Sequence, residues 1–128
     1  MTGFGLLLDL YNTGEPVYVE GSSLTLVSDK TDYTREEPIT LLLINTGTVP
    51  LKFVNSYSIK VSGLVGIIQY ESPKNDTTYT LEPREEFTFV WDQIRTDGNF
   101  ITSGTYRVTS SATANDIALE RSVIINIT

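Results

Sequence analysis

The sequence contains neither histidine nor cysteine among its 128 residues. Histidine is the side chain that most often moves protons near neutral pH, and cysteine supplies thiolates for nucleophilic attack and for zinc binding. Both absences argue against a hydrolytic triad, a cysteine nucleophile and a zinc centre. Disulfides are excluded as well, so a packed core must provide the stability. We therefore expect a protein that is not an enzyme and needs no cofactor and no metal.

Basic residues are also scarce. Nine Lys and Arg stand against 16 Asp and Glu, which gives a formal net charge of −7 and a pI near 4.4. Nucleic acids and anionic lipids are bound by clusters of basic side chains, whereas these are scattered singly, so neither is expected as a partner. The apolar run Phe4–Leu8 is far shorter than the roughly 20 residues that span a bilayer. Because it lies so near the start, we expect a domain cut from a longer chain with an N-terminal membrane anchor.

Apolar and polar residues alternate in short windows, which is the pattern of a strand with one buried face. The clearest window is Phe87–Trp91, with three aromatic side chains on one face, and Val123, Ile125 and Ile127 repeat the pattern. Further strands are expected at Leu6–Leu10, Val17–Val19, Leu24–Val27, Ile39–Ile44, Leu51–Val54, Tyr57–Val61, Gly66–Tyr70, Thr78–Leu81, Tyr106–Ser110 and Ile117–Leu119. Turn residues separate them, and we expect positive φ angles at Asn12–Gly14, Asn45–Gly47, Ser62–Gly63, Asp97–Gly98 and Ser103–Gly104.

No window of helical length shows 3.6-residue spacing, so at most one helical turn is expected, near Thr34–Glu37. The predicted class is all-β, in a single domain over residues 1–128. About eight to ten short strands at this spacing favour an immunoglobulin-like antiparallel β-sandwich, although a closed barrel fits the same periodicity.

Two segments have more apolar residues than one core face requires. Ile39–Ile44 is apolar on both faces, as in a mid-sheet strand whose outer face is covered by a loop or a partner. The second segment, from residue 49 to 61, is explained either by core packing or by an exposed patch. On the second reading Val49, Leu51, Phe53 and Ile59 form a homodimer interface, and Ile59→Lys gives a folded monomer.

Other candidate sites carry weaker patterns. The acidic clusters Asp29, Asp32, Glu36, Glu37 and Glu82, Glu85, Glu86 match no EF-hand spacing, and solvated loops explain them better than a calcium site does. Asn75 begins a glycosylation sequon in an expected loop, while the sequon at Asn126 falls in the last strand. Aromatic side chains near strand ends could stack on sugars, namely Tyr11, Tyr18, Tyr57, Tyr70 and Tyr79. A carbohydrate- or calcium-binding module is therefore an alternative.

The segment Tyr33–Ile39, followed by Leu41, Leu43 and Asn45-Thr46-Gly47, is similar to the opening of many prokaryotic extracellular immunoglobulin-like modules. With the apolar start and the acidic, Thr-rich, cysteine-free composition, the chain resembles the soluble domain of archaellum stator proteins of the F/G type. The resemblance implies a membrane-anchored sandwich in the pseudo-periplasmic space of an archaeal envelope. It also implies anchoring of the archaellum motor by contact with the surface-layer protein. A second copy and a sister stator subunit are further implied partners.

A second resemblance covers Glu85 to Val108. Trp91, Asp97-Gly98 and Gly104-Thr105-Tyr106 are similar to the late pattern of BsuPI-type intracellular proteinase inhibitors. That family is also a sandwich, and the resemblance implies protease inhibition. The same residues suit any sandwich in which a Trp packs on the core and a Tyr anchors the next strand.

Overall fold

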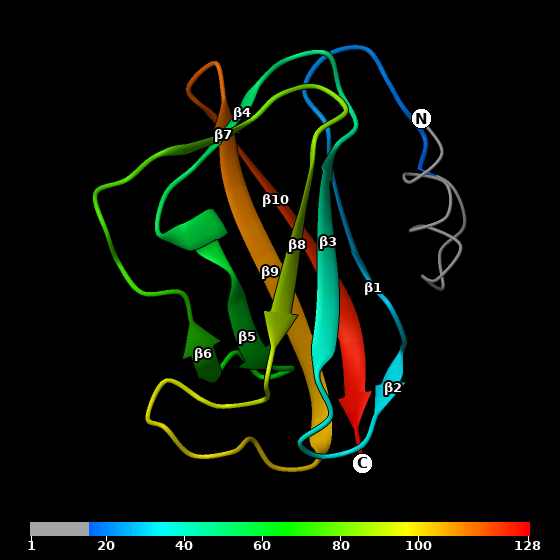
Figure 1. Cartoon of the computed structure of the whole chain (residues 1–128), viewed down its shortest axis with the longest axis vertical. Helices are drawn as coiled ribbons and strands as arrows, with labels where there is room; N and C mark the ends of the chain where they lie inside the picture. The colour runs from blue at the N-terminus through cyan, green and yellow to red at the C-terminus, as the bar shows by residue number, and fades with distance from the viewer. Residues whose placement is uncertain (1–15) are drawn as a thin grey trace.

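Two β-sheets face each other in the computed structural model, which describes residues 16–128 (Figure 1). The first sheet has the order β1 (Leu24–Ser28), β3 (Ile39–Asn45), β8 (Glu86–Trp91). The second has the order β2 (Asp32–Tyr33), β10 (Ile117–Ile127), β9 (Gly104–Ala114), β4 (Leu51–Phe53), β7 (Tyr79–Leu81). Strand β5 (Lys60–Gly63) also pairs with β9, and β6 (Ile68–Glu71) pairs with β5. The predicted all-β, immunoglobulin-like sandwich is confirmed, with ten strands in the described part and one parallel pair, β2 with β10.

Strand β3 is buried on both faces, as its sequence predicts. Leu41 and Leu43 point into the core between the sheets. Leu42 and Ile44 point to the outer face, where they form a second buried cluster with Val27, and Tyr18 packs against it. Successive side chains of a strand alternate between faces, so each face of β3 has its own apolar contacts.

Strands β9 and β10 are longer than expected. Each has 11 residues, and they pair along their whole length from Ala114 opposite Ile117 to Gly104 opposite Ile127. The segments predicted as two strands, Ile117–Leu119 and Val123–Ile127, are therefore one. The polar residues between them interrupted the apolar alternation, but they lie on an exposed part of the ladder where no core contact is needed.

Other predicted elements differ from the structure. Val17–Val19 is irregular, and Leu6–Leu10 lies outside the described residues. Thr34–Glu37 is a tight turn rather than a helical one, with Glu37 N–H donating to Thr34 O at 3.3 Å. The described residues, 16–128, contain no helix that is long and apolar enough to cross a membrane.

A left-handed turn replaces the first part of the predicted strand Tyr57–Val61. Asn55, Ser56, Tyr57 and Ser58 have φ angles of 52°, 52°, 68° and 51°. This conformation is unfavourable for L-residues and persists only when surrounding contacts impose it. Ser110 Oγ donates to Tyr57 O at 2.7 Å, and Ser58 N–H donates to Asn55 O at 3.0 Å. These bonds keep the turn in place and direct the Tyr57 ring toward the core.

The residues that resemble proteinase inhibitors have structural roles. Trp91 is buried, and its indole N–H donates to Ile94 O at 3.0 Å. The Tyr106 hydroxyl donates to Thr102 O at 2.8 Å, four residues upstream, an anchor like the tyrosine corner of immunoglobulin-like sandwiches. Sandwich packing therefore explains these residues.

Candidate protein-binding surface

The predicted homodimer interface does not lie on the surface. Leu51, Phe53 and Ile59 are fully buried in the core between the sheets, and Val49 is partly buried and packs against that core. The prediction of an exposed patch there is wrong. The segment consists of two short strands separated by the left-handed turn, so its apolar side chains reach one core from both sides of the turn.

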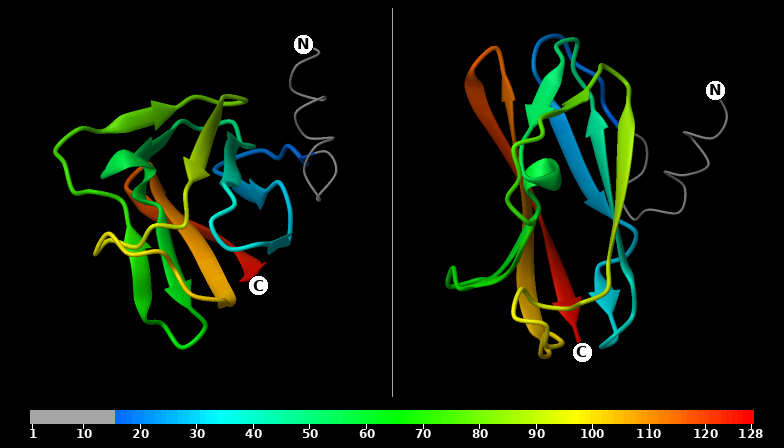
Figure 2. Two further views of the ribbon diagram at one scale, coloured as in Figure 1. Left: turned by 60° about the horizontal axis from the view of Figure 1, so that its bottom comes forward. Right: turned by 60° about the vertical axis from the view of Figure 1, so that its left-hand side comes forward.

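A different apolar surface is exposed at the tip of the β5–β6 hairpin. Leu64, Val65, Ile67 and Ile68 expose 54%, 86%, 64% and 49% of their surface. The hairpin projects away from the sandwich (Figure 2). Tight turns usually carry Gly, Asn, Asp or Ser, so large aliphatic side chains at this tip are not explained by turn formation. We call these four residues the hairpin tip.

The turn of the hairpin is tightly closed. Gly66 N–H donates to Gly63 O and Gly63 N–H donates to Ile67 O, each at 2.9 Å. Gly66 has a φ of 95°, a conformation that glycine adopts without steric cost. Leu64 and Val65 are the two residues between these glycines, so the backbone holds both aliphatic side chains outward.

The base of the hairpin is fixed to the sandwich from two sides. On one side β5 pairs with β9, with Val61 opposite Val108. On the other, Thr96 N–H donates to Gln69 O at 3.0 Å, and Glu71 N–H donates to Thr96 Oγ1 at 3.1 Å. The tip is thus an exposed apolar surface on a rigid support, and binding through it would require little ordering of the backbone.

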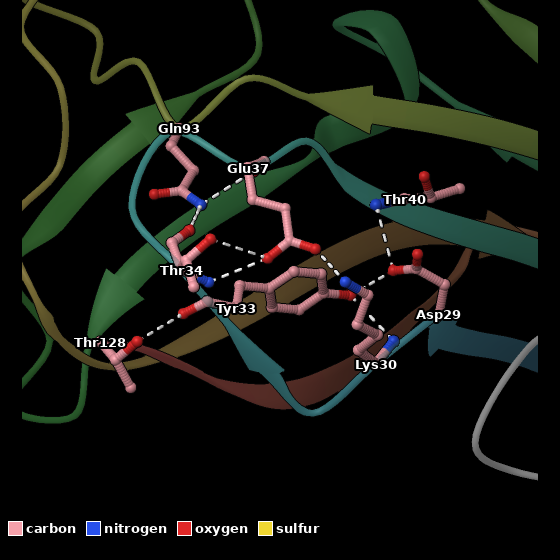
Figure 3. A network of polar contacts seen from close by, with 8 residues as sticks. All are labelled: Asp29, Lys30, Tyr33, Thr34, Glu37, Thr40, Gln93 and Thr128. Carbon is pink, nitrogen blue, oxygen red and sulfur yellow. Dashed lines mark hydrogen bonds and ion pairs between the residues drawn. The ribbon is translucent and has the colours of Figure 1, made fainter.

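The first acidic cluster belongs to a structural network at one end of the sandwich (Figure 3). Glu37 pairs with Lys30 and accepts from Thr34 N–H at 2.9 Å. The Tyr33 hydroxyl donates to Asp29, and Gln93 Nε2 donates to the carbonyls of Thr34 and Glu37, each at 2.8 Å. In residues 16–128 no three acidic side chains converge as a metal site would require. These carboxylates fix the loop between β2 and β3.

Two pKa shifts follow from such contacts. Burial, together with the hydrogen bond to Asp29, raises the pKa of the Tyr33 hydroxyl far above its ordinary value. At the surface, the bond from the Arg95 guanidinium lowers the pKa of the Asp97 carboxyl to about 2. Both groups therefore stabilise local loops in their ordinary protonation states at neutral pH.

Among the tyrosines proposed for sugar stacking, the four that the structure describes do not form a flat exposed platform. Tyr57 stacks on Phe87 with ring centroids 3.8 Å apart and on Tyr79 at 5.1 Å. The Arg84 guanidinium lies 4.4 Å from the centroid of the Tyr18 ring. Tyr70 packs against Trp91, and Tyr11 lies outside the described residues. The ring faces of Tyr18 and Tyr57 are thus largely occupied by other side chains.

Asn75 lies in an exposed loop, as the sequence suggests. Its side-chain oxygen accepts from Thr77 N–H at 3.0 Å, and its amide nitrogen donates to Ser56 Oγ at 3.2 Å. Glycosylation at Asn75 stays a prediction. Asn126 is half-buried in β10 and donates to Asp32 at 3.0 Å, which makes it a poor acceptor.

Comparisons with known proteins add little to this description. The sequence matches no family model, and the search of curated proteins found no match. Among solved structures, β-glucosidase from Listeria innocua in complex with glucose matches 83% of this chain with 12% identity and a TM-score of 0.39. A mutant of that enzyme in complex with laminaribiose matches 84% with 14% identity and a TM-score of 0.35. The chain spans 16% of each enzyme, and likenesses this distant carry no argument about function.

The hairpin tip was not among the predicted site residues, although the sequence carries a signal for it. Gly63 and Gly66 flank a Leu-Val pair, and two isoleucines follow. Turn glycines around large aliphatic residues place those residues outside the strands, where a core cannot cover them.

Proposed function

We propose that this chain is a non-enzymatic protein-binding domain and that the hairpin tip is its contact surface. The observation that carries the proposal is the exposure of four large aliphatic side chains on a projecting hairpin whose base is fixed to the sandwich. Burying such side chains against a partner contributes roughly 25 cal/mol per Å² of apolar area. Exposed apolar clusters on small soluble domains commonly mark interfaces.

The chemistry of the tip indicates the kind of surface that it fits. The stretch from Ser62 to Gln69 contains no charged residue, so it can enter an apolar pocket without burying a charge. The remainder of the chain is strongly acidic, with a formal net charge of −7. An apolar pocket with a basic rim is therefore the complementary surface, because the acidic body would be attracted to the rim.

The resemblance to archaellum stator proteins supplies a specific partner for this proposal. On that basis the domain anchors the archaellum motor in an archaeal envelope, and the hairpin tip contacts the surface-layer protein. The acidic composition and the sandwich fold are compatible with this role. Binding of the surface-layer protein through the tip is the form of the proposal that can be tested.

Hydrogen–deuterium exchange of the domain with and without purified surface-layer protein tests it. We expect slower exchange at the backbone amides of residues 62–69, because a bound partner excludes water from the tip. The turn Asn115–Asp116 at the far end of β9 and β10 is the internal control and should exchange at the same rate in both samples. A complex that protects other segments would contradict the proposed surface. Failure to form a complex would contradict the proposed partner.

A further inference from the structure

Strand β8 forms one edge of the three-stranded sheet. It pairs with β3 on one side, and the sheet ends there in the described part of the chain (Figure 1). An edge strand presents main-chain donors and acceptors that can pair with another extended segment. Natural edges are often blunted by charge or proline; β8 has one charged residue, the half-buried Glu86 at its start, and its exposed residues are Thr88 and Val90.

The ladder shows which main-chain groups face outward. Asn45 N–H donates to Glu85 O at 3.0 Å, and the register continues with Leu42 opposite Thr88 and Thr40 opposite Val90. In an antiparallel pair, opposite residues alternate between two kinds. In one kind the main-chain N–H and C=O groups bond across to the partner strand, and in the other these groups point away from it. Counted from Asn45 and Glu85, the N–H and C=O groups of Thr88 and Val90 face away from β3.

A groove lies beside this edge, between β8, β6 and the loop that follows β8. Its volume is about 480 Å³, within the range of pockets that hold ligands. The floor includes Tyr70, Phe89 and Trp91, with the Tyr70 ring 6.3 Å from Phe89 and 5.7 Å from Trp91 between centroids. An apolar side chain entering the groove would contact aromatic rings on several sides.

The rim of the groove is acidic. Glu71 and Asp92 line it, and both are exposed. Arg95 also lines it, but its guanidinium is paired with Asp97. The uncompensated charge at the rim is therefore negative, which favours lysine or arginine in a bound segment.

We propose that the β8 edge and this groove form a peptide-binding site. The occupant is an extended segment of a partner protein that pairs with the main chain of Thr88 and Val90. It places an aliphatic side chain in the groove and a lysine or arginine beside Glu71 and Asp92. This site is separate from the hairpin tip, so the inference goes beyond the proposed function and does not depend on it.

The probe is a blocked peptide of about nine residues, alternating valine and threonine with a lysine at each end, a length typical of a strand. Titration is followed by the amide NMR shifts of Thr88 and Val90 and by the fluorescence of Trp91, the sole tryptophan. We expect saturable shifts at both amides. We also expect affinity to fall at least about fivefold when the terminal lysines are replaced by glutamate.

Two variants at one position separate main-chain pairing from side-chain contact. Val90→Pro removes the outward N–H and is tolerable at a sheet edge, whereas Val90→Thr keeps that N–H. We expect Val90→Thr to bind like the native protein and Val90→Pro to lose at least about tenfold in affinity.

A peptide methylated on its pairing nitrogens tests main-chain pairing on the native protein, so this test does not depend on folding of the proline variant. We expect the methylated peptide to bind at least about tenfold more weakly than the unmethylated one. Equal binding of the methylated peptide, no amide shift at about millimolar peptide, or shifts confined to residues 62–69 would overturn the proposal. Concentration-dependent shifts at Thr88 and Val90 without peptide would also overturn it, because they would show a second copy on this edge.

Discussion

Replacing Ile59 with lysine is expected to unfold the domain. Ile59 is fully buried, and its backbone N–H donates to Ser72 Oγ at 3.0 Å, which fixes the residue in the core. Loss of the aliphatic side chain costs about 2–5 kcal/mol, and burial of an unpaired ammonium adds several more. The total approaches the 5–15 kcal/mol that typically stabilise a domain, by order of magnitude.

Circular dichroism and urea unfolding check this expectation, with Val54→Lys as the matched control. Val54 is exposed and lies next to the same turn, so its replacement should change the free energy of unfolding by less than about 0.5 kcal/mol. A folded Ile59→Lys protein with native stability would show that Ile59 belongs to a surface. The exposed-patch interpretation of the sequence predicts that outcome, whereas the buried position of Ile59 predicts the opposite.

Replacing Gly47 with alanine is expected to lower the free energy of unfolding by about 3 kcal/mol, near the upper end of overpacking effects. A Cβ at this position would lie 2.1 Å from Gly21 O and 2.8 Å from Ser23 N, both backbone atoms. Gly21 O also accepts from Thr48 N–H at 2.8 Å, so relief of the clash would disturb that bond. Glycine is required here for a close approach between two segments of the chain, and the positive φ that the sequence predicted at Asn45–Gly47 is not found.

The midpoint of urea unfolding measures this effect, and Gly63→Ala is the control. Gly63 also lacks a positive φ, and a Cβ there would come no closer than 4.0 Å to Ile67 O. Its replacement should therefore change stability by less than about 1 kcal/mol. Similar midpoints for the two alanine variants would contradict the close approach at Gly47.

The strands were largely predictable because local alternation reports which face is buried. The window Phe87–Trp91 has its aromatic residues inward and Thr88 and Val90 outward, as predicted. The two-sided burial of β3 was also predictable, since both faces are apolar in the sequence. Alternation did not predict the left-handed turn at Asn55–Ser58, because that conformation depends on contacts with residues distant in sequence, such as Ser72 and Ser110.

The candidate surface was harder to predict than the fold. The segment from Val49 to Ile59 and the hairpin tip are similarly apolar in sequence, yet one is core and the other is exposed. Composition cannot distinguish them, because exposure depends on whether a second sheet lies opposite. The turn between β4 and β5 brings the first segment under the other sheet, whereas Gly63 and Gly66 carry Leu64 and Val65 away from the sandwich.

The central claim is that binding depends on the hairpin tip, and one comparison of affinities tests it most directly. Surface-layer protein is titrated against the native domain, Val65→Asp and Ile117→Asp, because Val65 and Ile117 are both exposed aliphatic residues beside hairpin turns. We expect Val65→Asp to bind at least about tenfold more weakly, since a charge at the centre of an apolar contact is poorly tolerated. Ile117→Asp should bind like the native domain. Equal affinities for Val65→Asp and the native domain would contradict the account.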